Sequence, residues 1–174
     1  MEEINQRVIY SVKKGNRKAF KRIVNFYKHT VYEICMTGIK DVVLAEEVSK
    51  KVFLYVHYNI NQYDTNENFS LWLYLITVKH ALDYRNEVNQ NKLNIQSDSV
   101  LQEKVNINET KETLNTQERL LLLLRYRLCI PIDELSQIFD IPKTILKPTL
   151  RDLLEKISWN NSKVDNELLN TGFL

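Results

Sequence analysis

The 174-residue sequence has only three Gly, three Pro and two Cys, and it has no long run of apolar residues. Glycine and proline interrupt helices, so their scarcity beside many Leu, Ile, Lys and Glu residues predicts an all-α fold with short connections. No apolar run approaches the roughly 20 residues that a membrane-spanning helix needs. The opening residues, MEEINQRVIY, lack the basic and then apolar pattern of a signal peptide, which predicts a cytoplasmic protein.

The sequence also lacks the groups of residues that catalysis and metal binding require. No Ser-His-Asp or Cys-His set and no Gly-rich phosphate loop is apparent, and His29, His57 and His80 fall in separate helical patterns. Cys35 and Cys129 lie in apolar-periodic surroundings without a further Cys or His at metal-ligand spacing, so we expect both to be reduced core residues. The sequence therefore predicts a protein that is not an enzyme and that has no cofactor or metal.

The net charge of +2 is small and unevenly distributed. Residues 1–85 contain 13 Lys and Arg against 9 Asp and Glu, residues 86–113 contain 3 against 5, and residues 114–174 contain 8 of each sign. A dedicated DNA-binding protein usually has a stronger basic face. We therefore expect any DNA contact to be weak or to depend on a partner.

A polar stretch divides the chain into two blocks. Residues 86–113, NEVNQNKLNIQSDSVLQEKVNINETKET, are rich in Asn, Gln, Glu and Ser and contain no aromatic residue. Such a segment buries too little apolar surface to offset its ordering entropy. We therefore expect two small helical domains, residues 1–86 and 114–160, joined by a linker at 87–113 and followed by a tail at 161–174.

The first block shows four helical patterns. The first covers about residues 3–14, and the second runs from residue 17 to near Gly38 with an apolar stripe on one face. Asp41 is a suitable N-cap for the third. A loop over residues 64–66 then leads into the fourth helix, in which we expect Trp72 to anchor the core.

The second block contains the elements of a helix-turn-helix. Asn115 and Glu118 have the spacing of a capping box and precede a leucine-rich helix. Residues 133–139 form a second short helical pattern, 140–143 a turn and 144–157 a third helix, which is the minimum of a helix-turn-helix. The periodicity alone leaves open whether this pair binds DNA or only packs.

The order of these parts resembles that of a bacterial RNA polymerase sigma factor of the extracytoplasmic-function type, which has a region-two domain, a linker and a region-four domain. The resemblance covers roughly residues 5–86 and 113–157. The region-two helices are similar to GNRKAFKRIVNFYKHTVYEIC, AEEVSKKVFLYV and FSLWLYLITVKHALDYRN here, and region four to ERLLLLLRYRLCIPIDELSQIFDIPKTILKPTLRDLLEKI. No single motif is specific, and the serial order carries the resemblance.

The resemblance implies binding to core RNA polymerase and to the minus-ten and minus-thirty-five elements of promoter DNA. The sequence leaves open whether an anti-sigma protein is a further partner. In this family the third region-two helix contacts the largest polymerase subunit. The matching positions here are Glu46, Glu47, Lys50 and Phe53. Lys50 and Lys51 stand where the family usually has Gln and Glu, and they would repel a basic partner surface.

Family members also capture a flipped base of the minus-ten element with the loop before the fourth helix, which requires a polar pocket. The positions that the resemblance assigns to that pocket are Tyr63, Asp64, Asn66, Asn68 and Ser70. It assigns the neutralisation of the DNA strand to Lys79, His80 and Arg85. Val78, Lys79 and Asn86 depart from the family's usual residues, so we expect a weaker backbone contact.

For the minus-thirty-five element, the resemblance assigns phosphate and base contacts in the major groove to Lys143, Thr144, Lys147, Thr149 and Arg151. Pro148 stands where the family commonly has Ser, and proline is tolerated only in a first helical turn. The helix is therefore expected to start late or to bend. Thr149 and Asp152 replace arginines, and Asp152 would repel phosphate.

Two alternatives remain open at the level of sequence. A sigma-like protein that acts through protein contacts, with little DNA binding, is favoured by Lys50, Lys51, Pro148 and Asp152. A simple helix-turn-helix regulator would not need the whole first block.

Overall fold

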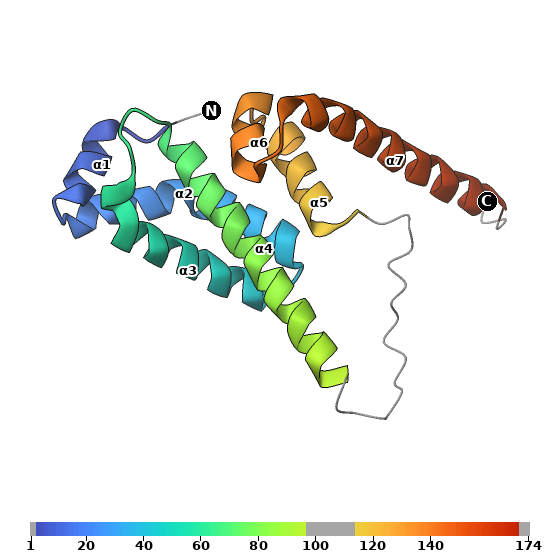
Figure 1. Cartoon of the computed structure of the whole chain (residues 1–174), viewed down its shortest axis with the longest axis horizontal. Coiled ribbons are helices and arrows are strands. Elements are labelled where there is room, and N and C mark those ends of the chain that lie inside the picture. Colours follow the sequence, from blue (N-terminus) through green and yellow to red (C-terminus); the bar gives the residue numbers. More distant parts are fainter. Residues whose placement is uncertain (1–2, 97–113, 171–174) are drawn as a thin grey trace.

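The computed structural model describes the backbone of residues 3–96 and 114–170, and the side chains of residues 3–87 and 114–157. Over these ranges the chain forms helices and no strand, so the all-α prediction is confirmed. The helices labelled in Figure 1 are α1 (Gln6–Lys13), α2 (Arg17–Ile39), α3 (Val42–Asn59), α4 (Phe69–Gln96), α5 (Thr116–Leu122), α6 (Ile132–Phe139) and α7 (Lys143–Asn170). Residues 97–113 of the predicted linker and 171–174 of the predicted tail lie outside the described residues.

Short polar side chains start the first three helices. Asn5, Asn16 and Asp41 accept hydrogen bonds from backbone N–H groups of the first turns of α1, α2 and α3, which otherwise lack partners. The prediction that Asp41 caps the third helix is confirmed. Helix α2 ends at Ile39, and the left-handed φ of 60° at Lys40 turns the chain into α3.

Helix α4 is longer than the sequence suggested. It continues to Gln96, through the first ten residues of the predicted linker. These residues contain neither Gly nor Pro, and extending an existing helix adds one hydrogen bond for each residue that is fixed. Near its start Trp72 is half-buried, with ring centroids 5.4 Å from Tyr63 and 5.8 Å from Phe69, as expected of a residue that anchors the core.

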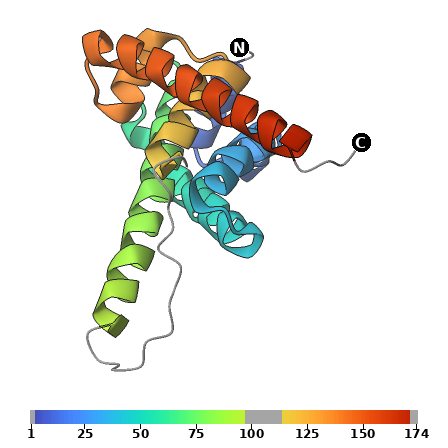
Figure 2. The same cartoon turned by 90° about the vertical axis from the view of Figure 1, so that its right-hand side faces the viewer.

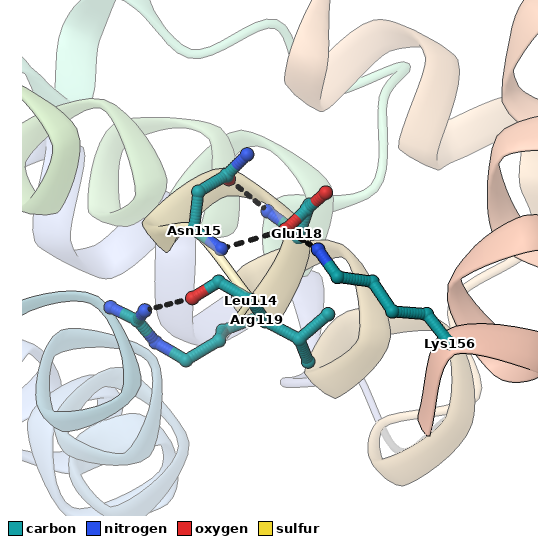
Figure 3. A network of polar contacts seen from close by, with 5 residues as sticks. All are labelled: Leu114, Asn115, Glu118, Arg119 and Lys156. Carbon is teal, nitrogen blue, oxygen red and sulfur yellow. Dashed lines mark hydrogen bonds and ion pairs between the residues drawn. The ribbon is translucent and has the colours of Figure 1, made fainter. Parts of the chain in front are cut away.

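The predicted capping box at the start of α5 is present (Figure 3). Oδ1 of Asn115 accepts from the backbone N–H of Glu118 at 2.8 Å, and Oε2 of Glu118 accepts from the backbone N–H of Asn115 at 2.7 Å. Lys156 of α7 places its Nζ atom 3.5 Å from the same Glu118 oxygen. The first and last described helices of this block are thereby joined at one carboxylate.

The connection from α5 to α6 corrects one prediction. Helix α5 passes into the π-helix η2 (Leu123–Arg127), after which Cys129 has a left-handed φ of 55° and is exposed. The expectation that Cys129 is a core residue is therefore wrong, because the turn out of the π-helix rotates it away from the leucine face. Cys35 is buried, as predicted.

Helix α7 contains Pro148 in its interior. Of the two predicted outcomes, a late start or a bend, the late start did not occur, because the helix begins at Lys143, five residues before Pro148. Proline has no N–H group, so the carbonyl of Thr144 loses the helical hydrogen bond that it would otherwise accept. Asp140 closes the preceding turn in the left-handed conformation, with φ 53°.

Helices α5 and α6 pack against α2 and α4, and both views place them on one side of the N-terminal helices (Figure 1 and Figure 2). One continuous core includes Ile34 from the first block and Leu120 and Leu124 from the second. Gly38 permits this approach, because a Cβ atom at this position would lie 3.0 Å from Cβ of Ala81 and 3.6 Å from Cδ1 of Leu120. We call this packing of α5 and α6 on α2 and α4 the closed arrangement.

No helix in residues 3–96 or 114–170 has the length and apolar character needed to cross a membrane. Within the same ranges, no three His, Cys, Asp or Glu side chains converge in a way that would hold a metal ion.

Candidate functional site

The exposed face of α3 carries three of the four residues expected to contact polymerase. Glu46, Glu47 and Lys50 are exposed, whereas Phe53 is buried at 9% exposure. Phe53 lies on the apolar stripe that packs against the neighbouring helices, so the structure removes it from the candidate surface.

The two glutamates on this face are already paired within the helix. Nζ of Lys50 lies 3.8 Å from Glu46, and Nζ of Lys51 lies 2.8 Å from Glu47. The hydrogen bond from Lys51, together with its charge, lowers the pKa of the Glu47 carboxyl. A basic partner must therefore compete with two lysines for these carboxylates, although exposed pairs of this kind are weak because water screens them.

The sequence did not single out three apolar residues on the same face. Val43, Leu54 and Tyr58 are 73%, 55% and 77% exposed, and their spacing of 11 and 4 residues aligns them along one side of α3 with Glu47. The signal was present in the sequence as apolar residues outside the buried stripe. Together with Glu46 and Glu47 they form the surface that we call the α3 face.

The loop before α4 differs from the pocket that was expected. Tyr63 is 2% exposed, its ring lies 5.2 Å from that of Phe69, and its hydroxyl donates to the carbonyl of Glu67. Ser70 is 3% exposed, and its hydroxyl and backbone N–H donate to Oε1 of Glu3. Neither side chain is available to line a base pocket, and both predictions are corrected.

The rest of the loop is polar and exposed. Oδ1 of Asp64 accepts from the backbone N–H and the side-chain Nδ2 of Asn66 at 2.9 Å and 3.0 Å, which fixes a tight turn. Asn68 is also exposed, and its Nδ2 atom donates to Glu134 of α6 at 3.3 Å. Asp64, Asn66 and Asn68 remain as loop residues that a partner can reach.

The three basic residues expected on α4 do not share a face. Lys79 lines a cavity of about 310 Å³ between α4, α5 and α6, beside Asp83 and Asp140. His80 donates from Nδ1 to the carbonyl of Ile76 at 2.8 Å, and its ring lies 5.3 Å from that of Tyr55 on α3. Arg85 is half-buried farther along the helix. Lys79 and His80 therefore face different neighbours in this arrangement.

Four of the five residues assigned to the minus-thirty-five element are exposed on α7: Lys143, Thr144, Lys147 and Arg151. Thr149 is half-buried, and its hydroxyl donates to the carbonyl of Ile145 at 2.8 Å, so it is turned toward its own helix. Ile145 itself is 55% exposed and was not predicted as a candidate.

Two of the cations on α7 have acidic neighbours. Nζ of Lys143 lies 2.5 Å from Oδ1 of Asp133, and Nε of Arg151 lies 3.8 Å from Oδ1 of Asp152. These carboxylates reduce the attraction of the helix for phosphate. Lys147 is the candidate cation that makes no ion pair among the described residues.

About half of the sequence is similar to proteins of known function. No family model matches the sequence. Over 83 residues, 48% of this chain, it is 36% identical to the ECF RNA polymerase sigma factor SigW of Bacillus subtilis (strain 168), of which it covers 44%. It is 23% identical over 83 residues to the RNA polymerase sigma-H factor of Pseudomonas aeruginosa, of which it covers 43%. The chain thus spans about half the length of the curated relatives it matches.

The fold is shared over nearly the whole chain. CnrH, solved in complex with the cytosolic domain of CnrY, matches with a TM-score of 0.68 at 16% identity, over 90% of this chain and 96% of that one. RpoE of Bartonella quintana, solved with the anti-sigma factor NepR, matches with a TM-score of 0.63 at 10% identity, over 80% of this chain and 94% of that one. The chain is similar to extracytoplasmic-function sigma factors. The resemblance stated from the sequence is confirmed.

In this sigma-factor-like chain the loop before α4 and the start of α7 lie close together. Asn68 of the loop contacts Glu134, and Asp133, the preceding residue of α6, pairs with Lys143 at the start of α7. The closed arrangement therefore places the loop and the helix-turn-helix side by side.

Proposed function

We propose that the chain is an RNA polymerase sigma factor, which binds core polymerase and directs it to promoters with minus-ten and minus-thirty-five elements. The observation that carries this proposal is the 36% identity to SigW over 83 residues, on a fold that matches sigma factors over most of the chain. In this proposal the protein acts without catalysis of its own, in the cytoplasm where polymerase works.

The α3 face is the proposed polymerase contact. It combines the carboxylates of Glu46 and Glu47 with the exposed side chains of Val43, Leu54 and Tyr58. Carboxylates form strong, directed hydrogen bonds with arginines, and apolar side chains beside them exclude water from such pairs. Because Lys50 and Lys51 compete for the same carboxylates, the apolar residues have the larger share of the contact.

Promoter DNA is the second proposed partner. We assign the minus-ten contact to Asp64, Asn66 and Asn68 of the loop, and the minus-thirty-five contact to the exposed face of α7 with Thr144 and Lys147. These elements lie roughly 25 base pairs apart, or about 85 Å at 3.4 Å per base pair. The closed arrangement holds the loop beside the helix-turn-helix, so we infer that the two blocks separate when the chain binds a promoter.

We retain the two-domain division as part of the proposal. Residues 1–86 and 114–160 are the proposed domains, the linker is 87–113 and the tail is 161–174; the helix to Gln96 gives the first part of the linker a structure of its own. Two solved chains of this fold are held in complexes with CnrY and NepR. An anti-sigma protein is accordingly a proposed third partner.

Reconstitution with bacterial core polymerase tests the function. The chain should form a complex with core enzyme and yield transcripts from specific start sites on a library of promoter fragments, which core enzyme alone does not. Reversing both charges in Glu46→Lys/Glu47→Lys should weaken capture of polymerase. The matched control is Asp133→Lys/Asp152→Lys, which makes the same change in charge on the other block and should leave capture intact.

A second candidate is a sigma-like protein that acts by protein contacts with little DNA binding. It is favoured by the ion pair of Lys143 with Asp133, by the proximity of Asp152 to Arg151, and by Pro148 inside α7. Capture of polymerase without any defined transcript would favour this candidate. A simple helix-turn-helix regulator predicts neither capture nor transcript initiation.

A further inference from the structure

The first two helices carry a concentration of positive charge that the count over residues 1–85 conceals. Residues 4–32 contain no Asp or Glu. They contain eight basic residues: Arg7, Lys13, Lys14, Arg17, Lys18, Lys21, Arg22 and Lys28. Residues 33–85 contain five Lys and Arg against seven Asp and Glu, which brings the average back to a small excess. The net positive charge of the first block therefore lies on α1, α2 and the turn between them.

The acidic residues at either end of this stretch are engaged elsewhere. Glu3 accepts hydrogen bonds from Ser70 and from the hydroxyl of Tyr27, and Glu33 accepts from Nε of Arg127 at 3.3 Å. Lys13 donates to the carbonyl of Tyr63 at 2.6 Å and is thereby used in the fold. The remaining cations of α1 and α2 have no carboxylate of the described residues to neutralise them.

Three of these cations surround a pocket of about 240 Å³ between α1 and the start of α2. Arg7, Lys18 and Arg22 line it and are exposed, and within residues 3–87 and 114–157 none of them makes an ion pair. Asn16 also lines it; its Oδ1 atom is occupied by the N–H groups of Lys18 and Ala19, which leaves Nδ2 as the remaining donor of that side chain. The residues that line the pocket thus carry two guanidinium groups, an ammonium group and an amide donor.

We propose that this α1–α2 basic pocket binds the phosphodiester backbone of DNA, a contact that rests on the proposed function in transcription. Guanidinium and ammonium groups are the usual partners of phosphate oxygens, and none of the described residues that line the pocket has a carboxylate that would repel phosphate. A contact of this kind holds DNA without selecting its sequence, and its strength falls steeply with salt because bound counterions are released.

The pocket remains accessible in the closed arrangement. Helix α1 lies at the end of the molecule opposite the outer end of α7, with α2 and α4 between them (Figure 1). The basic pocket therefore provides a first, sequence-independent hold on DNA while Asn68 of the loop before α4 is still bonded to Glu134 of α6. The selective contacts follow when the blocks separate.

Salt-dependent DNA binding by the full chain, without polymerase, tests the proposal. The probes are a fluorescent duplex and the matching single strand, both of non-promoter sequence, measured by anisotropy from about 50 to 200 mM salt. Arg7→Gln/Lys18→Gln/Arg22→Gln should lower the affinity at low salt about tenfold or more, and should reduce the slope of log affinity against log salt by roughly two to three on the duplex. On the single strand, each lost phosphate contact should reduce this slope by about 0.7, compared with about 0.9 on the duplex. The probe on which the pocket variant shows such a reduction is the form of DNA that the pocket binds.

The matched control is Lys50→Gln/Lys51→Gln/Arg127→Gln, which also changes the net charge from +2 to −1 but lies outside the pocket. It should leave the slope within about one unit of the wild type. Arg7→Lys/Arg22→Lys keeps both charges and should restore most of the affinity, which separates loss of charge from loss of fold. Equal slopes for the pocket variant and the control overturn the proposal.

Two further outcomes separate this proposal from the others. Binding of the chain to phosphatidylglycerol vesicles that the pocket variant loses, with DNA binding unchanged, would assign the pocket to a lipid headgroup and overturn it. A pocket variant that loses DNA affinity, in a chain that fails to direct transcription, would support the pocket while the proposed sigma function falls. Normal transcription, with the same salt slope for the pocket variant and the wild type, would support the sigma function and overturn the proposed pocket.

Discussion

Nδ2 of Asn68 lies 3.3 Å from Oε1 of Glu134, across 66 residues of sequence. This contact joins the loop before α4 to α6 of the helix-turn-helix, in the block that carries α7. An exposed hydrogen bond contributes little stability alone, so the closed arrangement depends on what lies behind it. The stronger contacts are the buried leucines of α5 and the bonds made by Arg119.

Arg119→Ala should destabilise the closed arrangement. The Arg119 guanidinium donates to the carbonyls of Thr37 at 3.2 Å and Gly38 at 3.4 Å, in the last turn of α2, which has no basic residue of its own. It also donates to the carbonyl of Leu114 at 2.7 Å (Figure 3). Because a cation at a helix C-terminus also interacts favourably with the helix dipole, we expect a loss of about 1.5–3 kcal/mol in unfolding free energy by urea denaturation.

The control for this substitution is Arg127→Ala. Arg127 also bridges the blocks, through Glu33 at 3.3 Å, but its side chain is 74% exposed. Its loss should cost less than about 1 kcal/mol. An equal effect of the two substitutions would show that the bonds of Arg119 to α2 are not what holds α5 in place.

Gly38→Ala should separate the effects of helix propensity and packing. Alanine favours a helix by about 1 kcal/mol over glycine, but its methyl group would lie 3.0 Å from Cβ of Ala81, which cannot rotate away. We expect a net loss of about 1–2 kcal/mol, measured by thermal unfolding. In Gly38→Ala/Ala81→Gly the clash is removed, so the double variant should be more stable than the sum of the single changes predicts. Strict additivity would contradict the close approach.

Pro148→Ala should stabilise the helix-turn-helix. The substitution restores the hydrogen bond to the carbonyl of Thr144 and removes the clash of the proline ring with it, which we expect to raise the unfolding free energy by about 1–3 kcal/mol. Pro142→Ala is the control, because Pro142 precedes α7 and loses no helical bond; its effect should stay below about 1 kcal/mol. If the two changes have the same effect, Pro148 does not weaken the helix.

The two cysteines should differ in reactivity toward iodoacetamide. Burial raises the pKa of the Cys35 thiol to about 11, so only about one thiol in a thousand is ionised at pH 8, and the thiolate is the reactive form. Raising the pH toward 11 increases the ionised fraction about tenfold for each unit. Cys129 is exposed and should be alkylated first in the native protein. Mass spectrometry of a tryptic digest reports both sites, and faster labelling of Cys35 at pH 8 would contradict its burial.

What the sequence predicted correctly depends on near neighbours in the chain. The N-cap at Asp41 and the capping box of Asn115 and Glu118 are made by residues three positions apart, and both were confirmed. The exposure of Tyr63 was misjudged because its surroundings come from elsewhere: Lys13 from α1 donates to its carbonyl, and the rings of Phe69 and Trp72 cover it. An aromatic residue in a polar loop gives no local sign of such contacts.

For the candidate surfaces, too, the sequence predicted local features correctly and missed those that depend on distant parts of the chain. Glu46 and Glu47 were placed correctly on an exposed face by helical periodicity, but Phe53 belongs to the core stripe of the same helix. Lys79 and His80 are adjacent in sequence and were grouped as one strand contact; successive helical residues point about 100° apart, and they face different neighbours. The basic pocket was missed because charges were counted over long segments, whereas it depends on α1 folding back beside α2.

The capping box at Asn115 also bears on how tolerant the chain is to change. Because the two hydrogen bonds that begin α5 are made between residues 115 and 118, the helix start does not depend on the length or composition of what precedes it. Lys156 then ties that start to α7 through Glu118. Insertions or deletions upstream of Leu114 can therefore alter the spacing between the two blocks while the second block keeps its internal register, so the separation that the blocks can reach is free to vary independently of their folding.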